Sequence, residues 1–447
     1  MRDTRVFLDF GSTFTKCAAF DLETETLTAR VQTPSTVDTD VTVGLQRALA
    51  LLAAELPITE REIRGAVACS SAAGGLRLAV CGLVPDYTTK AAHLAALGAG
   101  AKVVGVFSYE LSAAELAELD ALAPDIVLLT GGTDGGDRKN AVHNAHMLAR
   151  AARVQTVLYA GNKSARDEVA AAFYHSGKTV ILAPNVMPDF GALNLDPVNA
   201  EIRSLFLTRI MDAKGISRVR GVISGVVMPT PAAVLEAAKL LADGTAAEPG
   251  LGELLLTDVG GATTDVYSVA RGAPTREGAH LLGLREPYAK RTVEGDLGVY
   301  HNLDALSALV PEPGDTRALR ERYSVPEGGA MTRYQLLLSR AAVRTAVSRH
   351  AGTLERVATS NGEVWVQRGK DLTTVRRVIG SGGPLAFSSD PRFALEGAAT
   401  PDSPLVLTPS HPEYWLDERY ILFAVGLLAR AEPDKALRIA KKYLRRI

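Results

Sequence analysis

The chain has 447 residues, a formal net charge of −1 from 49 Lys and Arg against 50 Asp and Glu, and a hydrophobic content of 47%. This length predicts about two to three domains, and the composition is typical of a globular protein rather than a disordered one. The balanced charge argues against nucleic acid and an acidic membrane surface as partners. The three cysteines form no C-x-x-C pair, which disfavours a zinc ribbon, an iron–sulfur cluster held within one chain and a disulfide framework.

Targeting signals are absent from the pattern of the sequence. The N-terminal residues lack a basic stretch followed by an apolar segment, and no uncharged apolar run reaches the length of a membrane span. We therefore expect no signal peptide, no membrane partner and a location in the reducing cytoplasm.

The N-terminal part of the chain has short apolar runs and one helical pattern that ends at Pro57. Runs bounded by Gly and polar residues indicate strands, and apolar residues at helical spacing indicate a helix. The predicted elements are three strands, a helix and a further strand: 6–10, 15–22, 27–33, 41–56 and 65–71.

A different rhythm follows, in which continuous apolar runs alternate with helical patterns. The predicted strands are 103–107, 125–130, 156–160 and 179–183, and the helices between them are 112–123, 140–152 and 164–177. Such alternation is typical of a parallel sheet covered on both faces. We predict an inserted, Rossmann-like α/β domain at 77–200, between a first segment at 1–76 and a last segment at 201–447.

The last segment again has short apolar runs and helical patterns like those of the N-terminal part. It also contains a Pro-, Gly- and charge-rich stretch, which predicts a smaller subdomain at about 284–350. The predicted elements are a strand, a helix, two strands, a helix, a hairpin that leads into another strand, and a helix: 219–227, 231–242, 253–259, 263–270, 331–352, 363–380 and 420–431.

Two strand–turn–strand segments share one pattern: an apolar strand that ends in an acid, a Gly-containing turn with hydroxyl residues, and a second strand. They are DFGSTFTK (9–16) and DVGGATTD (258–265). Glycine lets the backbone approach a ligand closely, and turn N–H groups and hydroxyls can donate to phosphate oxygens. The candidate phosphate-binding residues are Gly11, Ser12, Thr13, Gly260, Gly261, Ala262 and Thr263. The alternative is two ordinary hairpins.

The charged residues of these segments suggest a metal-bound polyphosphate. Asp9 and Asp258 cannot donate hydrogen bonds when ionised, so beside phosphates they require Mg²⁺ or a water between them and the ligand. Lys16 would supply a compact positive charge toward the phosphates.

A third segment, RRVIGSGGPLAF (376–387), follows near the C-terminus. A Gly-rich turn after an apolar strand lets a base or ribose rest against backbone. The candidate residues are Gly380, Ser381, Gly382 and Gly383.

In this order the three segments resemble the superfamily of actin, sugar kinases and heat-shock chaperone ATPase domains. DFGSTFTK resembles its first phosphate loop, DVGGATTD its second and VIGSGGPLAF its adenosine loop, while MPTPAAVLEAA (228–238) and YILFAVGLLA (420–429) resemble its connecting segments. The resemblance implies an α/β, actin-like ATPase fold of two duplicated ribonuclease H-like halves, with the α/β insertion in the first half. It implies ATP and Mg²⁺ in the cleft between halves, with Asp9 and Asp258 as catalytic acids that hold the metal.

A closer resemblance covers nearly the whole chain and is to the glutamate mutase accessory protein family (GlmL/MutL), which is unrelated to the mismatch-repair protein of the same name. It is carried by SSAAGGLRLAV (70–80), GAGAKVVGVFSYEL (98–111), LLTGGTDGG (128–136), AGNKS (160–164), NVMPDFGALN (185–194), MPTPAAVL (228–235), DVGGATTDVYSV (258–269) and EPYAKRTVEGDLG (286–298). It implies an ATP-dependent chaperone or reactivating factor whose partners are adenosylcobalamin-dependent mutase subunits, of the glutamate mutase or aminomutase type. The chain would then be a slow ATPase and an accessory protein rather than a metabolic enzyme.

One departure from the superfamily pattern affects hydrolysis. Met228 stands where chaperone ATPases carry an acid and actin a Gln that positions the attacking water, and a thioether cannot orient water. Either another group does so, with Asp258 the leading candidate, or nucleotide acts mainly as a conformational ligand. Two other functions remain open: a small-molecule kinase of the sugar kinase/acetate kinase superfamily, and an ATP-driven electron activator with a shared iron–sulfur cluster, which the cysteine pattern disfavours.

The segment TGGTDGGDRKN (130–140) follows a predicted strand and opens a helix, where open α/β sheets bind ligands. Its polar members are Thr130, Thr133, Asp134 and Asn140. It is either a contact surface for the mutase, for a corrinoid or for a nucleoside, or a tight turn. His350 is predicted to interact with a helix dipole, and His143 with His146 either share a metal or lie on a solvated helix face.

Overall fold

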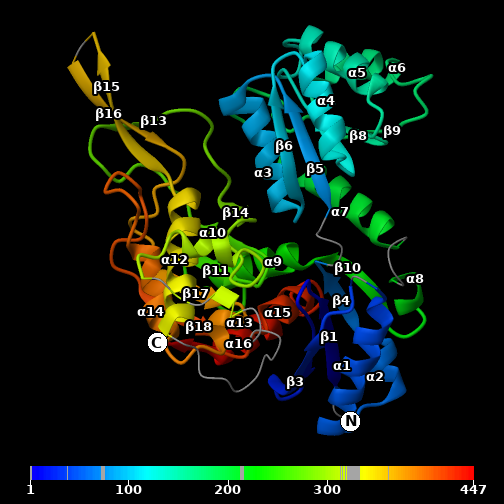
Figure 1. The fold of residues 1–447 in the computed structure, drawn as a ribbon, viewed down its shortest axis with the longest axis vertical. Coiled ribbons are helices and arrows are strands. Elements are labelled where there is room, and N and C mark those ends of the chain that lie inside the picture. The colour runs from blue at the N-terminus through cyan, green and yellow to red at the C-terminus, as the bar shows by residue number, and fades with distance from the viewer. Residues whose placement is uncertain are drawn as a thin grey trace. The chain divides into compact units, whose positions relative to one another are not determined.

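The computed structural model describes residues 3–37, 39–71, 76–211, 216–312, 314, 316–317, 319, 333–360 and 362–447. They form two compact units (Figure 1). Unit 1 comprises Met1–Ala72, Met211–Leu282 and Tyr288–Ile447, and unit 2 comprises Ala73–Ile210 and Gly283–Pro287. The boundaries expected at 77 and 200 stay predictions, as does the subdomain at 284–350, part of which lies outside the described residues.

The first sheet of unit 1 has the strand order β10-β4-β1-β2-β3. Its strands are β1 Thr4–Phe10, β2 Phe14–Asp21, β3 Thr26–Pro34, β4 Val67–Ser70 and β10 Gly225–Pro229. The first three strands pair antiparallel in sequence, whereas β4 and β10 add in parallel on the other side of β1. Helices α1 (Val41–Glu55) and α2 (Glu60–Arg64) connect β3 to β4.

The second sheet of unit 1 has the order β14-β12-β11-β17-β18-β19. Its strands are β11 Leu254–Val259, β12 Thr264–Val269, β14 Ala289–Glu294, β17 Arg377–Ser381, β18 Glu413–Asp417 and β19 Leu444–Arg446. Again the first three strands pair antiparallel, and the next two add in parallel beside the first. Apart from β19, the second sheet thus repeats the topology of the first. This duplicated ribonuclease H-like arrangement is the expected actin-like ATPase fold, which is confirmed.

A shared core joins the two sheets. Buried residues of both sheets pack with helices α9 (Thr230–Asp243), α15 (Leu422–Leu428) and α16 (Pro433–Tyr443) in one hydrophobic cluster. A second cluster packs other buried residues of the second sheet against α10, α12 and α14 (Leu303–Ser307, Arg333–His350 and Pro391–Leu395). A small sheet contains β13, β16 and β15 (Ala279–Leu281, Gly362–Arg368 and Thr353–Thr359).

Unit 2 is built on a parallel sheet with the order β6-β5-β7-β8-β9. The strands are β5 Arg77–Gly82, β6 Lys102–Ser108, β7 Ile126–Leu129, β8 Thr156–Tyr159 and β9 Thr179–Leu182. The main helices between and after them are α3 Lys90–Gly98, α4 Ala113–Leu122, α5 Lys139–Arg150, α6 Arg166–Ala171 and α7 Leu195–Met211. In this order β6 lies on one side of β5 and the later strands lie on the other side, which is the arrangement of a doubly wound sheet.

One strand of the structure was not predicted from the sequence, and one predicted strand begins later than expected. The strand that was not predicted is β5, which lies at the start of the inserted segment and pairs with both β6 and β7. The strand expected at 219–227 begins only at Gly225, since α8 (Ile216–Val219) and a turn precede it. Gly225 has φ of +126°, a conformation that favours glycine, so the turn into β10 is fixed there. Within the described ranges, no helix is both long and apolar enough to cross a membrane.

Candidate functional site

The two Gly-containing turns of unit 1 have the same backbone geometry. The N–H of Gly11 donates to the carbonyl of Phe14 at 3.0 Å, and the N–H of Gly260 donates to the carbonyl of Thr263 at 2.9 Å. A Cβ at Gly11 or Gly260 would lie 2.7 or 2.9 Å from that same carbonyl oxygen. Glycine is therefore required in both turns by close backbone approach.

Neighbouring segments bind the carbonyl groups of both turns. In the first turn, Ser35 donates its N–H to the carbonyl of Thr13 and its hydroxyl to the carbonyl of Gly11, at 2.9 and 2.7 Å. In the second, N–H groups of residues 299–301 and the side-chain amide of Asn302 donate to the carbonyls of residues 260–262. No hydrogen bond within the described part of the chain uses the N–H groups of 12–13 or 261–263. The turns thus keep donors available for an anion.

The two turns meet each other. A Cβ at Gly261 would lie 2.8 Å from Oγ1 of Thr13, so the second turn packs directly against the first. The Thr13 hydroxyl oxygen is buried and has no hydrogen-bond partner among the described residues. A buried hydroxyl without a partner is costly in a folded protein, which makes Thr13 a candidate hydrogen-bond donor to a ligand.

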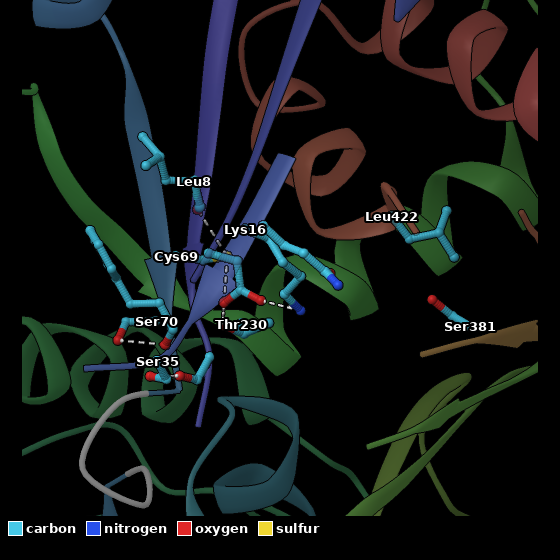
Figure 2. A network of polar contacts seen from close by, with 12 residues as sticks. Leu8, Lys16, Ser35, Cys69, Ser70, Thr230, Ser381 and Leu422 are labelled. Carbon is cyan, nitrogen blue, oxygen red and sulfur yellow. Dashed lines mark hydrogen bonds and ion pairs between the residues drawn. The ribbon is translucent and has the colours of Figure 1, made fainter. Parts of the chain in front are cut away.

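Asp9 and Lys16 form a buried ion pair at the base of the first turn. Their register in the β1–β2 ladder places them opposite each other, and Nζ of Lys16 lies 2.6 Å from Oδ2 of Asp9, with side chains 8% and 1% exposed. The Thr230 hydroxyl donates to Oδ1 of Asp9 at 2.5 Å, and the Cys69 thiol contacts the same oxygen at 3.7 Å (Figure 2). Burial alone would lower the pKa of Lys16, but Asp9, Tyr420 and Asp258 hold it above its ordinary value.

Asp258 lies at the corresponding end of β11 and faces an acid rather than a lysine. Its ladder partner is Asp265, which is engaged by Arg291 with an N–O distance of 2.6 Å. Burial raises the pKa of Asp258 to about 7; the nearby acids, Asp265 first, add to this rise, while Lys16 opposes it. This carboxylate therefore lacks the direct counter-charge that Asp9 has.

The third Gly-rich segment contacts the second turn. Gly382 has φ of +97°, and a Cβ there would overlap the carbonyl of Val259 and lie 2.8 Å from Oδ1 of Asp258. Gly380 packs against Leu395, and Gly383 begins the short helix α13 (Gly383–Ala386). The adenosine-loop candidates and the second phosphate-loop candidates are thus adjacent.

The structure brings most predicted site residues together, with two qualifications. Ser12 is exposed at the tip of the first turn. The hydroxyl of Ser381 is buried and donates to Asp417, so it is used inside the protein.

Sequence reasoning missed several residues of this site. Thr230 and Tyr420 lie in the connecting segments, Asp417 is the last residue of β18, and Arg291 lies in β14. Met228 is 3% exposed and packs in the core shared by the two sheets, so the polar group that this connection offers is Thr230, two residues later. The signal that could have found Thr230 is its place next to Pro at a predicted helix start.

In unit 2 the TGGTDGG loop follows β7 and is fixed by neighbouring loops. Oδ1 of Asp134 accepts from the N–H of Lys163 and from the side chain of Asn185, at 2.9 and 3.0 Å. The Asn162 amide bonds to Gly135, Gly136 and Asp137. The loop is therefore braced by two other strand-end loops of the same sheet.

Two of the three histidines considered in the sequence form hydrogen bonds, whereas His146 is exposed on α5. His143 contacts the carbonyl of Leu111 at 3.1 Å. His350 is fully buried at the C-terminal end of α12, with ring nitrogens 2.8 Å from the hydroxyls of Thr292 and Ser268, and its interaction with the helix dipole stays a prediction. Among the described residues, no group of three or more His, Cys, Asp or Glu side chains is arranged to hold a metal ion.

Comparison with known proteins agrees with the motif analysis. The family model described as MutL protein matches residues 5–444. "Protein MutL" of Clostridium tetanomorphum is 43% identical over 462 residues, covering 99% of each chain. The chain belongs to the MutL family. The resemblance to the glutamate mutase accessory (GlmL/MutL) family is thereby confirmed.

Solved structures show only distant similarity. Component A of the (R)-2-hydroxyglutaryl-CoA dehydratase of Acidaminococcus fermentans is 11% identical, with 98% of both chains covered and a TM-score of 0.30. Xylulose kinase of Bifidobacterium adolescentis is 11% identical, with 98% of this MutL-family chain and 93% of the kinase covered and a TM-score of 0.30. The fold assignment therefore depends on the duplicated strand order described above.

Proposed function

We propose that this MutL-family protein binds MgATP between its two duplicated sheets and acts as an ATP-dependent chaperone or reactivating factor for an adenosylcobalamin-dependent mutase. The observation that carries the nucleotide part is the contact between the two Gly turns, at Gly261 and Thr13, with the Gly-rich third segment beside them. Family membership supports the accessory role.

The proposed site assigns one task to each group of residues. The N–H groups of the two turns and the Thr13 hydroxyl would donate to phosphate oxygens, and Lys16 would face the phosphates from β2. The third segment, with Gly382 against Asp258, would hold the adenosine. Each sheet contributes one turn, so bound nucleotide favours the arrangement in which the turns meet, and ATP and ADP would favour it to different extents.

Mg²⁺ fits the chemistry of the two strand-end acids. Oxygen donors of carboxylates are the ligands that Mg²⁺ prefers, directly or through water, and Asp9 and Asp258 provide one from each sheet. The raised pKa of Asp258, about 7, marks a carboxylate that would be stabilised by a cation. Bound Mg²⁺ would neutralise part of the phosphate charge. Asp9 and Asp258 would hold the metal and its waters in position.

Hydrolysis by this site should be slow. Met228 is buried in the core and offers no polar group for water. The groups that remain are the Thr230 hydroxyl, which is already bonded to Asp9, and Asp258. Asp258 would then be the residue that positions the attacking water beside the metal.

The test of this proposal combines turnover with reactivation. Purified protein is assayed for Mg-dependent ATP hydrolysis and for recovery of a cognate cobalamin-dependent mutase inactivated by damaged cofactor. Asp258→Ala should abolish both while retaining adenosine binding, because the acid meets metal and water rather than base. Equal turnover by variant and wild type would remove Asp258 from the site. Phosphate transfer to a sugar or carboxylate acceptor would instead favour a small-molecule kinase.

Unit 2 is proposed to serve the partner, since nucleotide binding does not require its five parallel strands. Asp134→Ala removes the acceptor that fixes the TGGTDGG loop to Lys163 and Asn185. We expect this variant to bind ATP normally and to lose mutase association in a pull-down. Full reactivation of the mutase by a correctly folded variant would show that the loop is a tight turn without a role in partner binding.

A further inference from the structure

A chain of contacts runs from the third Gly-rich segment to Lys16. It starts at Ser381, the last residue of β17, whose hydroxyl donates to Oδ2 of Asp417 at 2.9 Å. Asp417 is 1% exposed and also accepts the N–H groups of Ile421 and Leu422, at 2.9 and 3.1 Å. Figure 2 shows Ser381 close to Leu422. Both oxygens of one buried carboxylate thus tie the Gly-rich segment to the start of α15.

The turn that Asp417 fixes holds one residue in an unusual conformation. Tyr420 has φ of +51°, the left-handed region, and its N–H donates to the carbonyl of Asp417 at 3.0 Å. A bulky residue adopts this conformation at a cost and keeps it only where the surrounding structure determines it. The hydrogen bonds to Asp417 supply that determination.

The Tyr420 ring receives the ammonium group of Lys16. Nζ of Lys16 lies 4.1 Å from the centroid of this ring. Lys16 is on β2 of the first sheet, whereas Tyr420 follows β18 of the second. Arg30 on β3 lies 5.2 Å from the ring of Phe387 and 5.7 Å from the ring of Tyr420. Cations over aromatic faces are attracted most strongly when water is excluded, so the ring fixes where the ammonium lies.

We propose that Asp417 and Tyr420 are positioning residues that connect the adenosine loop to Lys16. The Gly-rich segment fixes Asp417, Asp417 fixes the left-handed turn, and the turn holds the Tyr420 ring against the ammonium that would face the phosphates. A base bound to the third segment and a phosphate that faces Lys16 would therefore contact one connected structure, so that the two contacts are coupled. The nucleotide part of this inference rests on the proposed function.

The first arm of the test needs no nucleotide. Ligand-free protein is pulse-labelled with acetic anhydride, and acetylation of Lys16 is measured by mass spectrometry against the exposed Lys102. In Tyr420→Leu, labelling of Lys16 should rise by about fivefold, the loss expected for a cation–π contact. Tyr420→Phe, which keeps the ring and removes only the hydroxyl, should label Lys16 at a rate closer to wild type than to Tyr420→Leu. The matched control is Tyr109→Leu, a second left-handed tyrosine (φ +68°) that lies in unit 2 and should leave Lys16 labelling unchanged.

The second arm measures affinity by isothermal titration with MgATP and with adenosine. Tyr420→Leu should weaken ATP about tenfold and adenosine by less than about twofold, whereas Tyr420→Phe should lose clearly less ATP affinity than Tyr420→Leu. Asp417→Asn should shift the ATP-to-adenosine ratio in the same direction, and the double variant should lose no more than Tyr420→Leu alone, since the two residues act in one chain.

The outcomes separate this inference from the proposed function. Unchanged Lys16 labelling in Tyr420→Leu overturns the positioning role, whether or not ATP binds. Equal losses for ATP and adenosine also overturn it, because they would indicate general loosening. Increased labelling together with no ATP binding by wild type supports the positioning of Lys16 and overturns the proposed nucleotide site.

Discussion

At the position opposite the strand-end acid, the first hairpin of unit 1 carries Lys16 and the second carries Asp265. The backbones agree in detail, including the glycine N–H that donates across each turn at 3.0 and 2.9 Å. The charges do not agree: Asp9 is neutralised within its own hairpin, whereas Asp265 directs its charge to Arg291 and leaves Asp258 without a direct counter-charge. The two halves therefore share the geometry of the turn and differ in the charges around it.

The same contrast appears in the parallel strands. Cys69 pairs with Asp9 and with Met228, while Ser381 pairs with Asp258 and bonds to Asp417. Met228 and Asp417 thus lie at the ends of equivalent strands, β10 and β18, but the first is part of the core and the second accepts hydrogen bonds from a turn.

The largest expected effect is on the ion pair of the first hairpin. Lys16→Met keeps the length of the side chain but leaves Asp9 buried without a counter-charge, so we expect the free energy of unfolding to fall by about 3–5 kcal/mol in urea denaturation. Combining it with Asp9→Asn should recover most of the loss. A loss below about 1 kcal/mol would show that Asp9 does not depend on Lys16.

A smaller effect is expected where the third segment meets the second hairpin. Gly382→Ala places a Cβ against the backbone of Val259 in a left-handed conformation, and we expect a loss of about 1–3 kcal/mol from the backbone conformation alone. Gly383→Ala is the matched control, because its Cβ would meet nothing closer than 3.8 Å. Equal thermal stability of the two variants would contradict the close contact between these segments.

The pH dependence should report on the second half. Burial, with Lys290 and Lys370 nearby, holds the pKa of His350 well below its ordinary value of 6.5. The unfolded chain therefore binds the proton more readily, and this residue's contribution to stability is lost as the pH falls below about 6.5, by at most about 1.4 kcal/mol per pH unit. The urea midpoints of wild type and His350→Gln should therefore converge as the pH is lowered from about 7 to about 5. Parallel curves would mean that His350 is not held neutral.

The hairpins and their order were predictable because their signal is local: an acid, a glycine and hydroxyl residues between two apolar strands. Lys16 was expected at the phosphates, and its pairing with Asp9 depends on the register of β1 and β2. Thr230, Asp417 and Tyr420 were not predictable, since each acts on the site through contacts with residues far away in the sequence. The strand β5 was missed although residues 78–81 are a buried apolar run, because periodicity does not distinguish so short a run from part of a helix.

The central claim is that two duplicated hairpins with unequal charges form one MgATP site, and the Mg²⁺ dependence of ATP binding tests it most directly. Isothermal titration should show that wild type binds ATP more tightly with Mg²⁺ than with EDTA. Asp258→Ala should lose that difference and keep its affinity for adenosine. Equal Mg²⁺-dependent affinity in variant and wild type would contradict the account.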